Sequence, residues 1–319
     1  MAVAKVKPAG PANKRRFGFG DGIFSNLSLL FGAILIALLL ALVIILIIDA
    51  WPAIRQFGIS FIGSSVWDPV REIFGALPAI YGTLLSSLIA LIIAVPISVG
   101  AAIFLVELSP AWLSGPASFL IEMLAAIPSV IIGLWGLYVL VPIIRNPVEV
   151  WLQNALGIIP LFQGPQYGVG FLSAGVILAI MIIPIITAIS REAIRAVPQS
   201  QREAMLALGA TRWEMIRKTV LPFCRSGLVG AMILGLGRAL GETMAVTMVI
   251  GNGYNITASL FSPGTTIASK IASSFSEASG LEMGSLIELA LILFFVTLIV
   301  NIIARILVWR MSPVKAAKE

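Results

Sequence analysis

The chain has 319 residues, of which 59% are hydrophobic and 11% are charged, and its formal net charge is +6. Soluble domains carry about 25% charged residues, so the composition excludes an ordinary soluble protein and indicates a chain surrounded mostly by lipid. The sequence has no histidine, one cysteine and no GxxxxGK[ST] phosphate-binding loop, so we expect no enzyme activity and no metal or other cofactor. The positive charge fits loops on the inner side of a membrane, and we expect no nucleic-acid partner.

Six apolar stretches follow a basic N-terminal tail. Residues 1–20 mix Lys, Arg, Pro and Gly and are predicted to be disordered. The first apolar stretch is longer than the roughly 7–15-residue core of a signal peptide, so we interpret it as an uncleaved span. Spanning the membrane takes about 20 apolar residues. We therefore expect a membrane domain over 21–312 and a C-terminal tail at 313–319, with spans at about 27–48, 83–106, 118–141, 169–189, 223–250 and 286–308.

The distribution of Lys and Arg predicts how the chain is oriented. With the N-terminus inside, the predicted cytoplasmic segments hold 16 of these residues and the outer loops hold 4. Basic residues accumulate in cytoplasmic loops. Both termini are therefore expected in the cytoplasm, with the 190–222 loop on the same side.

Residues unusual for an apolar helix interrupt several predicted spans. Pro96, Pro128 and Pro184 each remove a backbone donor and should bend their helices. We interpret these bends as bundle geometry in preference to moving hinges. Glu122 and Glu288 lie nearer the span ends, and we expect them to be interfacial or paired structural carboxylates.

The loop at 190–222 is predicted to form two short helices. Ser200 and Glu203 have the spacing of a capping box, as do Thr211 and Glu214. Gly209 stands where a left-handed residue would end the first helix, at about 201–208. That helix presents small and apolar side chains, so it either docks in a partner's groove or lies on the lipid surface. The spacing alone leaves both interpretations open.

Several residues of this loop resemble a known motif. Glu203-Ala204-Met205, Gly209 and Thr219-Val220-Leu221-Pro222 are similar to the EAA motif of ABC importer permeases. The chain departs from the motif at Met205, where the family has Ala, and at Thr219, where it has Ile. In that family the helix inserts into the nucleotide-binding subunit. The resemblance therefore implies that Glu203, Ala204 and Gly209 form the coupling contact to an ATPase.

Two opposite charges lie within the predicted fifth span. Arg238 and Glu242 are costly in an apolar helix and, four residues apart, should share one helix face. In one interpretation, Arg238 meets a tetrahedral oxyanion through paired hydrogen bonds. In the other, the two residues neutralise each other as a structural or gating pair. The second is slightly favoured, because Glu242 would repel an anion.

The region around these charges resembles one subgroup of the family. Residues 235–247 are similar to the fifth-span signature of permease subunits of phosphate ABC importers. Further matches at 66–68, 75–83, 122–129 and 173–184 extend the resemblance over most of the chain. It implies an all-α, six-span type I importer permease. It also implies that the translocation or gating residues are Arg238, Glu242, Thr243 and Thr247.

The same resemblance implies a set of partners. The chain would form a heterodimer with a second permease in the bacterial inner membrane, in contact with membrane lipid. Two ATP-binding subunits would hold the ATP and Mg²⁺, and a periplasmic phosphate-binding protein would dock on the outer loops. Phosphate would then be imported by alternating access, with no covalent chemistry in this chain.

Three other functions remain open at this point. Sulfate, molybdate or another oxyanion would also suit a cationic membrane site. An ion-coupled carrier or channel is disfavoured by the EAA-like loop and by the lack of an evident inverted repeat with paired broken helices. A membrane enzyme is the least supported alternative, because the usual catalytic residue types are scarce.

Overall fold

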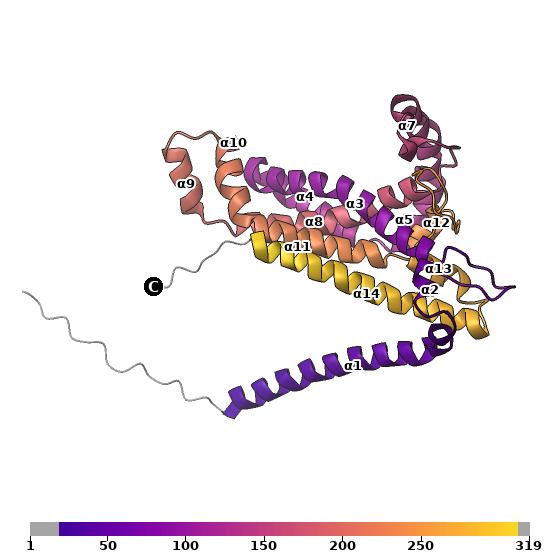
Figure 1. The fold of residues 1–319 in the computed structure, drawn as a ribbon. Helices are drawn as coiled ribbons and strands as arrows, with labels where there is room; N and C mark the ends of the chain where they lie inside the picture. Colours follow the sequence, from indigo (N-terminus) through magenta and orange to yellow (C-terminus); the bar gives the residue numbers. More distant parts are fainter. Residues whose placement is uncertain (1–18, 312–319) are drawn as a thin grey trace, which may run out of the picture. The chain divides into compact units, whose positions relative to one another are not determined.

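The computed structural model describes residues 19–311, which form helices and loops (Figure 1). The predicted tails at 1–20 and 313–319 lie almost wholly outside this part. Residues up to Ile48 form one unit, and those from Asp49 onward form a second. The described part of the first unit is one apolar helix, the larger portion of α1 (Phe19–Phe57). The second unit contains every other helix.

The second unit is a helical bundle with several short interruptions. Six of its helices are continuous with single π-helical turns. These turns lie at Phe104–Leu108 (η1), Gly136–Leu140 (η2), Ile144–Val148 (η3) and Ile216–Val220 (η5). Pro160–Phe162 forms a 3₁₀ turn (η4). The helices are α2 (Ser60–Gly63), α3 (Leu77–Ile103), α4 (Ala111–Ala125), α5 (Ser129–Trp135), α6 (Val141–Ile143), α7 (Glu149–Leu156), α8 (Phe171–Arg195), α9 (Gln199–Ala207), α10 (Arg212–Met215), α11 (Leu221–Gly241), α12 (Met244–Val249), α13 (Ile267–Ser274) and α14 (Gly280–Met311).

Six helical stretches are long and apolar enough to cross a membrane, which confirms the predicted number of spans. Pro96 and Pro184 lie inside α3 and α8, which continue past them. Pro128 instead separates α4 from α5, because the chain leaves the helix at this residue. The third apolar stretch therefore runs from Ser129 to Leu156, and the predicted bounds of 118–141 are wrong. The stretches are Phe24–Phe57, Leu77–Leu108, Ser129–Leu156, Phe171–Arg195, Arg212–Gly241 and Gly280–Ile306.

Helix α8 is the central element, and α3, α4 and α11 pack against it. Its Ile177, Ile182 and Ile186 side chains are fully buried. Small residues allow its neighbours to approach closely. A Cβ at Gly235 of α11 would lie 2.7 Å from Ile186 Cδ1. Close approach through small residues is the usual basis of helix association in lipid, where burial of apolar surface adds little.

Helices α2 and α13 lie at one end of the bundle (Figure 1), where aromatic side chains belong to one buried cluster. Trp67 Nε1 donates to Glu282 Oε1 at 3.1 Å, and Lys270 Nζ lies 4.7 Å from the centre of the Trp67 ring. The Tyr254 hydroxyl donates to the backbone oxygen of Gly75. Burial lowers the pKa of Lys270, with the charge of Glu282 acting in the opposite direction. These contacts tie the loops at 64–76 and 251–266 to α14.

We predict that Gly82→Ala destabilises the protein, because a Cβ at this position would overlap the backbone oxygen of Thr265. Overpacking a tight site costs about 1–3 kcal/mol. The control is Gly100→Ala on the same helix, where a Cβ meets no atom within 4 Å. At this position Ala should leave the free energy of unfolding unchanged or raise it by up to about 1 kcal/mol, because Ala has a better helix propensity than Gly. Thermal unfolding in detergent, followed by tryptophan fluorescence, measures both variants. Equal midpoints for the two variants would contradict the close approach.

Candidate functional site: an exposed helix and an interrupted span

Helix α9 lies at one end of the bundle beside α10, away from α12 and α13 (Figure 1). It begins at Gln199, with Pro198 as its N-cap and no side-chain cap. The predicted capping box of Ser200 and Glu203 is therefore wrong. The fixed φ of Pro198 starts the helix early, so Ser200 lies within the first turn.

The end of α9 and the start of α10 follow the prediction. Gly209 has φ +82°, and the Ala210 N–H donates to the Met205 oxygen at 3.2 Å while the Gly209 N–H donates to the Leu206 oxygen at 3.0 Å. These two bonds form a Schellman motif, which requires a left-handed residue at Gly209. The capping box of Thr211 and Glu214 is present. Two helices therefore meet at a defined corner.

The predicted coupling residues face outward at this corner. Glu203, Ala204 and Gly209 are all exposed. Leu206 and Leu208 are also exposed, and Leu208 keeps 84% of its surface accessible. No residue of α9 is fully buried. The helix therefore presents a mixed polar and apolar surface that a partner could cover.

The predicted fifth span, at about 223–250, is interrupted at Glu242. Helix α11 ends at Gly241, and Glu242 adopts an extended backbone (φ −69°, ψ 129°) before α12 begins at Met244. The prediction that Arg238 and Glu242 share one helix face is therefore wrong. Glu242 Oε1 instead accepts from the Ala245 N–H at 3.4 Å, so the carboxylate helps to satisfy the first turn of α12.

Arg238 and Glu242 are not paired with each other. The ion pairs within residues 24–306 do not include either residue. Arg238 is exposed, whereas Glu242, Thr243 and Thr247 are partly buried. The Thr247 hydroxyl donates to the Thr243 backbone oxygen at 2.7 Å. The four predicted translocation or gating residues thus lie around one break, and Arg238 is the most exposed of them.

A second interrupted span packs against the first. Helices α4 and α5 are separated at Ala126–Pro128, and α5 contacts α12. A Cβ at Gly133 of α5 would lie 2.9 Å from Ala245 Cα. The sequence predicts no inverted repeat with paired broken helices, an absence that disfavours an ion-coupled carrier. The structure places the two breaks on helices that contact each other, α5 and α12, so paired broken helices are present, and of this pattern only the expected lack of an inverted repeat still disfavours such a carrier.

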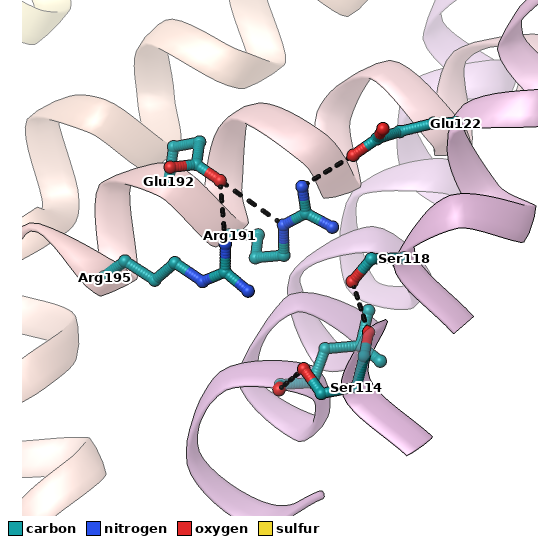
Figure 2. A network of polar contacts seen from close by, with 7 residues as sticks. Ser114, Ser118, Glu122, Arg191, Glu192 and Arg195 are labelled. Atoms are coloured by element: carbon teal, nitrogen blue, oxygen red, sulfur yellow. Dashed lines mark hydrogen bonds and ion pairs between the residues drawn. The ribbon is translucent and has the colours of Figure 1, made fainter. Parts of the chain in front are cut away.

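Charged residues also connect α4 to α8 (Figure 2). Arg191 Nη2 lies 2.7 Å from Glu122 Oε1, and Arg191 Nε lies 3.4 Å from Glu192 Oε1. The prediction of a paired carboxylate is confirmed for Glu122. Glu288 is not paired among the described residues: it is buried in α14, and its Oε2 has no hydrogen-bond partner there.

The chain matches a family model described as "Binding-protein-dependent transport system inner membrane component" over residues 94–313. A "Phosphate transport system permease protein PstC" from Haemophilus influenzae is 48% identical over 299 residues, covering 92% of this chain and 95% of the relative. A protein of the same name from Mesorhizobium japonicum is 45% identical, covering 98% and 97%.

Solved structures of ABC transporters share the fold. An inward-facing structure of the MetNI methionine ABC transporter has a chain that aligns with a TM-score of 0.56 at 17% identity, covering 77% of this chain and 100% of that one. A bacterial ABC transporter for the polysaccharide alginate aligns with a TM-score of 0.52 at 18% identity, covering 91% and 99%.

We predict that Thr211→Ala loosens the start of α10, because it removes the hydroxyl that accepts from the Glu214 N–H. Loss of such a cap costs about 1 kcal/mol, which corresponds to about fivefold faster hydrogen exchange in the segment that opens locally. Exchange mass spectrometry of a peptide spanning 209–216 measures the effect. Ser200→Ala is the control, because Ser200 caps no helix. Equal exchange in both variants would contradict the role of Thr211.

Proposed function

Because the chain belongs to the family of binding-protein-dependent transport system inner membrane components, we propose that it is the permease subunit through which an ATP-driven importer moves inorganic phosphate into the cytoplasm. The observation that carries the cargo is the 48% identity, over 92% of the chain, to a relative named as a phosphate permease. The six apolar helices support a multi-pass position in the bacterial inner membrane.

The proposed complex contains four further subunits. A second permease forms the other half of the pathway, two ATP-binding subunits supply ATP and Mg²⁺, and a periplasmic binding protein delivers phosphate. The excess of Lys and Arg on one side supports an orientation in which both termini and α9 face the cytoplasm. The exposed Glu203, Ala204 and Gly209 then form the surface that an ATP-binding subunit covers.

Arg238 is proposed to contact phosphate in the pathway between the two permeases. Its guanidinium is exposed on the subunit surface and forms no ion pair within residues 24–306. An arginine offers a planar fork of donors that matches a tetrahedral oxyanion. Glu242 is occupied in part at the start of α12, which leaves the cation less neutralised than a direct pair would.

Transport would follow the alternating-access cycle of this family. Loaded binding protein opens the permease pair to the outside, and ATP draws the two ATP-binding subunits together beneath α9. Hydrolysis then resets the complex. The chain itself performs no covalent step: it binds, orients and releases the anion.

The proposal predicts ATP-dependent uptake of radiolabelled phosphate in cells that express this chain with its partner subunits and lack other phosphate importers. Excess arsenate, a tetrahedral oxyanion with similar protonation, should abolish uptake, whereas sulfate should not. A fully assembled complex without phosphate uptake would contradict the cargo and leave the family assignment intact. Sulfate and molybdate would then be tested as cargo in the same cells.

We further predict that Arg238→Gln and Arg238→Lys each lower phosphate uptake at least about tenfold, because Lys keeps the charge but loses the fork. Glu242→Gln keeps an acceptor for the Ala245 N–H, so lower phosphate uptake by this variant would report the loss of the carboxylate charge. We expect lower uptake, because Glu242 lies at the same break as Arg238. Subunit assembly is checked by co-purification. Wild-type uptake by assembled Arg238→Gln would exclude Arg238 from the pathway.

A further inference from the structure

One ion pair in the bundle has both side chains buried. Arg202 of α9 lies against Glu107 of η1, with Nη2 at 2.9 Å and Nε at 3.1 Å from Glu107 Oε1. The two side chains are 11% and 7% exposed. In every other ion pair within residues 24–306, at least one partner is 32% exposed or more. The two residues are 95 positions apart in the chain.

The same guanidinium also holds the end of α8. Arg202 Nη2 donates to the Ile194 backbone oxygen at 2.8 Å, and Nη1 donates to the Val197 backbone oxygen. Carbonyls in the last turn of a helix lack partners within that helix. One side chain therefore joins α9, the end of α8 and the end of the α3–η1 helix.

The ion pair of Arg202 and Glu107 is surrounded by apolar side chains. Ala102, Ile194, Val197, Ile216 and Met215 are buried in one cluster at this end of the bundle, and Met205 of α9 packs against it. A buried charge pair adds little net stability, but removing one partner leaves the other uncompensated. Its geometry is therefore more constrained than that of an exposed pair.

Helix α9 has few other attachments. It has no fully buried residue and no side-chain cap. Movement imposed on its exposed face can pass to the bundle through the chain connections, through Met205 and through Arg202. Of these, Arg202 alone makes directed polar contacts with both α8 and η1.

A continuous series of contacts leads from this joint to Arg238. Helix α3 packs along α8, and Ser98 Oγ donates to the Ile183 oxygen at 3.2 Å. Helix α11, which carries Arg238, packs on α8 where Gly235 meets Ile186. Displacement of α8 and α3 would therefore displace the break at Glu242.

We propose that Arg202 and Glu107 are positioning residues that transmit movement of α9, driven by an ATP-binding subunit, into α3 and α8. This inference rests on the proposed function. Its consequence is specific: a complex without the pair still docks its ATP-binding subunits and still hydrolyses ATP, but the hydrolysis is poorly converted into transport.

The test uses the complete complex in proteoliposomes with loaded binding protein, and measures phosphate imported per ATP hydrolysed. Arg202→Lys keeps a charge, but one ammonium cannot reproduce the fork that reaches Glu107 and both carbonyls. Glu107→Gln keeps the size and removes the charge. Each variant should lower the ratio about tenfold, within the usual range for loss of coupling between two sites, with ATP-binding subunits still co-purifying.

Lys218→Gln is the matched control, because Lys218 forms an exposed pair with Glu214 at 3.6 Å on the neighbouring η5 turn. Its ratio should stay at the wild-type value. A wild-type ratio in assembled Arg202→Lys or Glu107→Gln overturns the proposal. So does failure of both variants to assemble or to retain ATP-binding subunits, because the pair would then serve folding or docking.

The wild-type complex separates this proposal from the one on which it rests. If it imports another oxyanion, the phosphate assignment fails and the ratio is measured with that cargo. If it imports nothing although ATP-binding subunits are bound, both proposals fail. If it imports phosphate and the variants keep its ratio, only the role of the ion pair fails.

Discussion

The close approach of helix backbones at small residues is the constraint on which the bundle depends. In lipid, apolar side chains gain little by leaving one apolar surface for another, so packing contacts and internal hydrogen bonds must hold the helices together. Gly175 and Gly235 place α3 and α11 directly on α8, and Gly133 places α5 on α12. The polar groups of the protein are arranged relative to this tightly packed centre.

The interruptions of the third and fifth spans are compatible with that packing because their polar groups find partners within the chain. Backbone groups freed inside a membrane must be satisfied by protein or by water in a cavity. At the break between α11 and α12, the Glu242 carboxylate accepts a hydrogen bond from the Ala245 N–H. The Thr247 hydroxyl donates to the Thr243 backbone oxygen. The break consequently ends α11 three residues after Arg238, close to a surface that a second permease would cover.

Local signals in the sequence predicted features that depend on neighbouring residues. The number of spans follows from the apolar stretches, and the corner between α9 and α10 follows from Gly209 and the Thr211 capping box. Ser200 misled the same reasoning, because Pro198 fixes the start of α9 first. The break at Glu242 was not predicted, since its surroundings contain no proline and read as a continuous helix. Glu107 and Arg202 could not be paired from sequence, because nothing local relates residues so far apart in the chain.

The exposed position of Arg238 has a consequence for the chain in the absence of a partner. In an unassembled chain this cation lies exposed in the last turn of an apolar helix, and a charged side chain in contact with lipid is costly. A partner that supplies water or counter-charge removes that cost. The residue proposed to contact the anion would therefore also favour association of the chain with a partner.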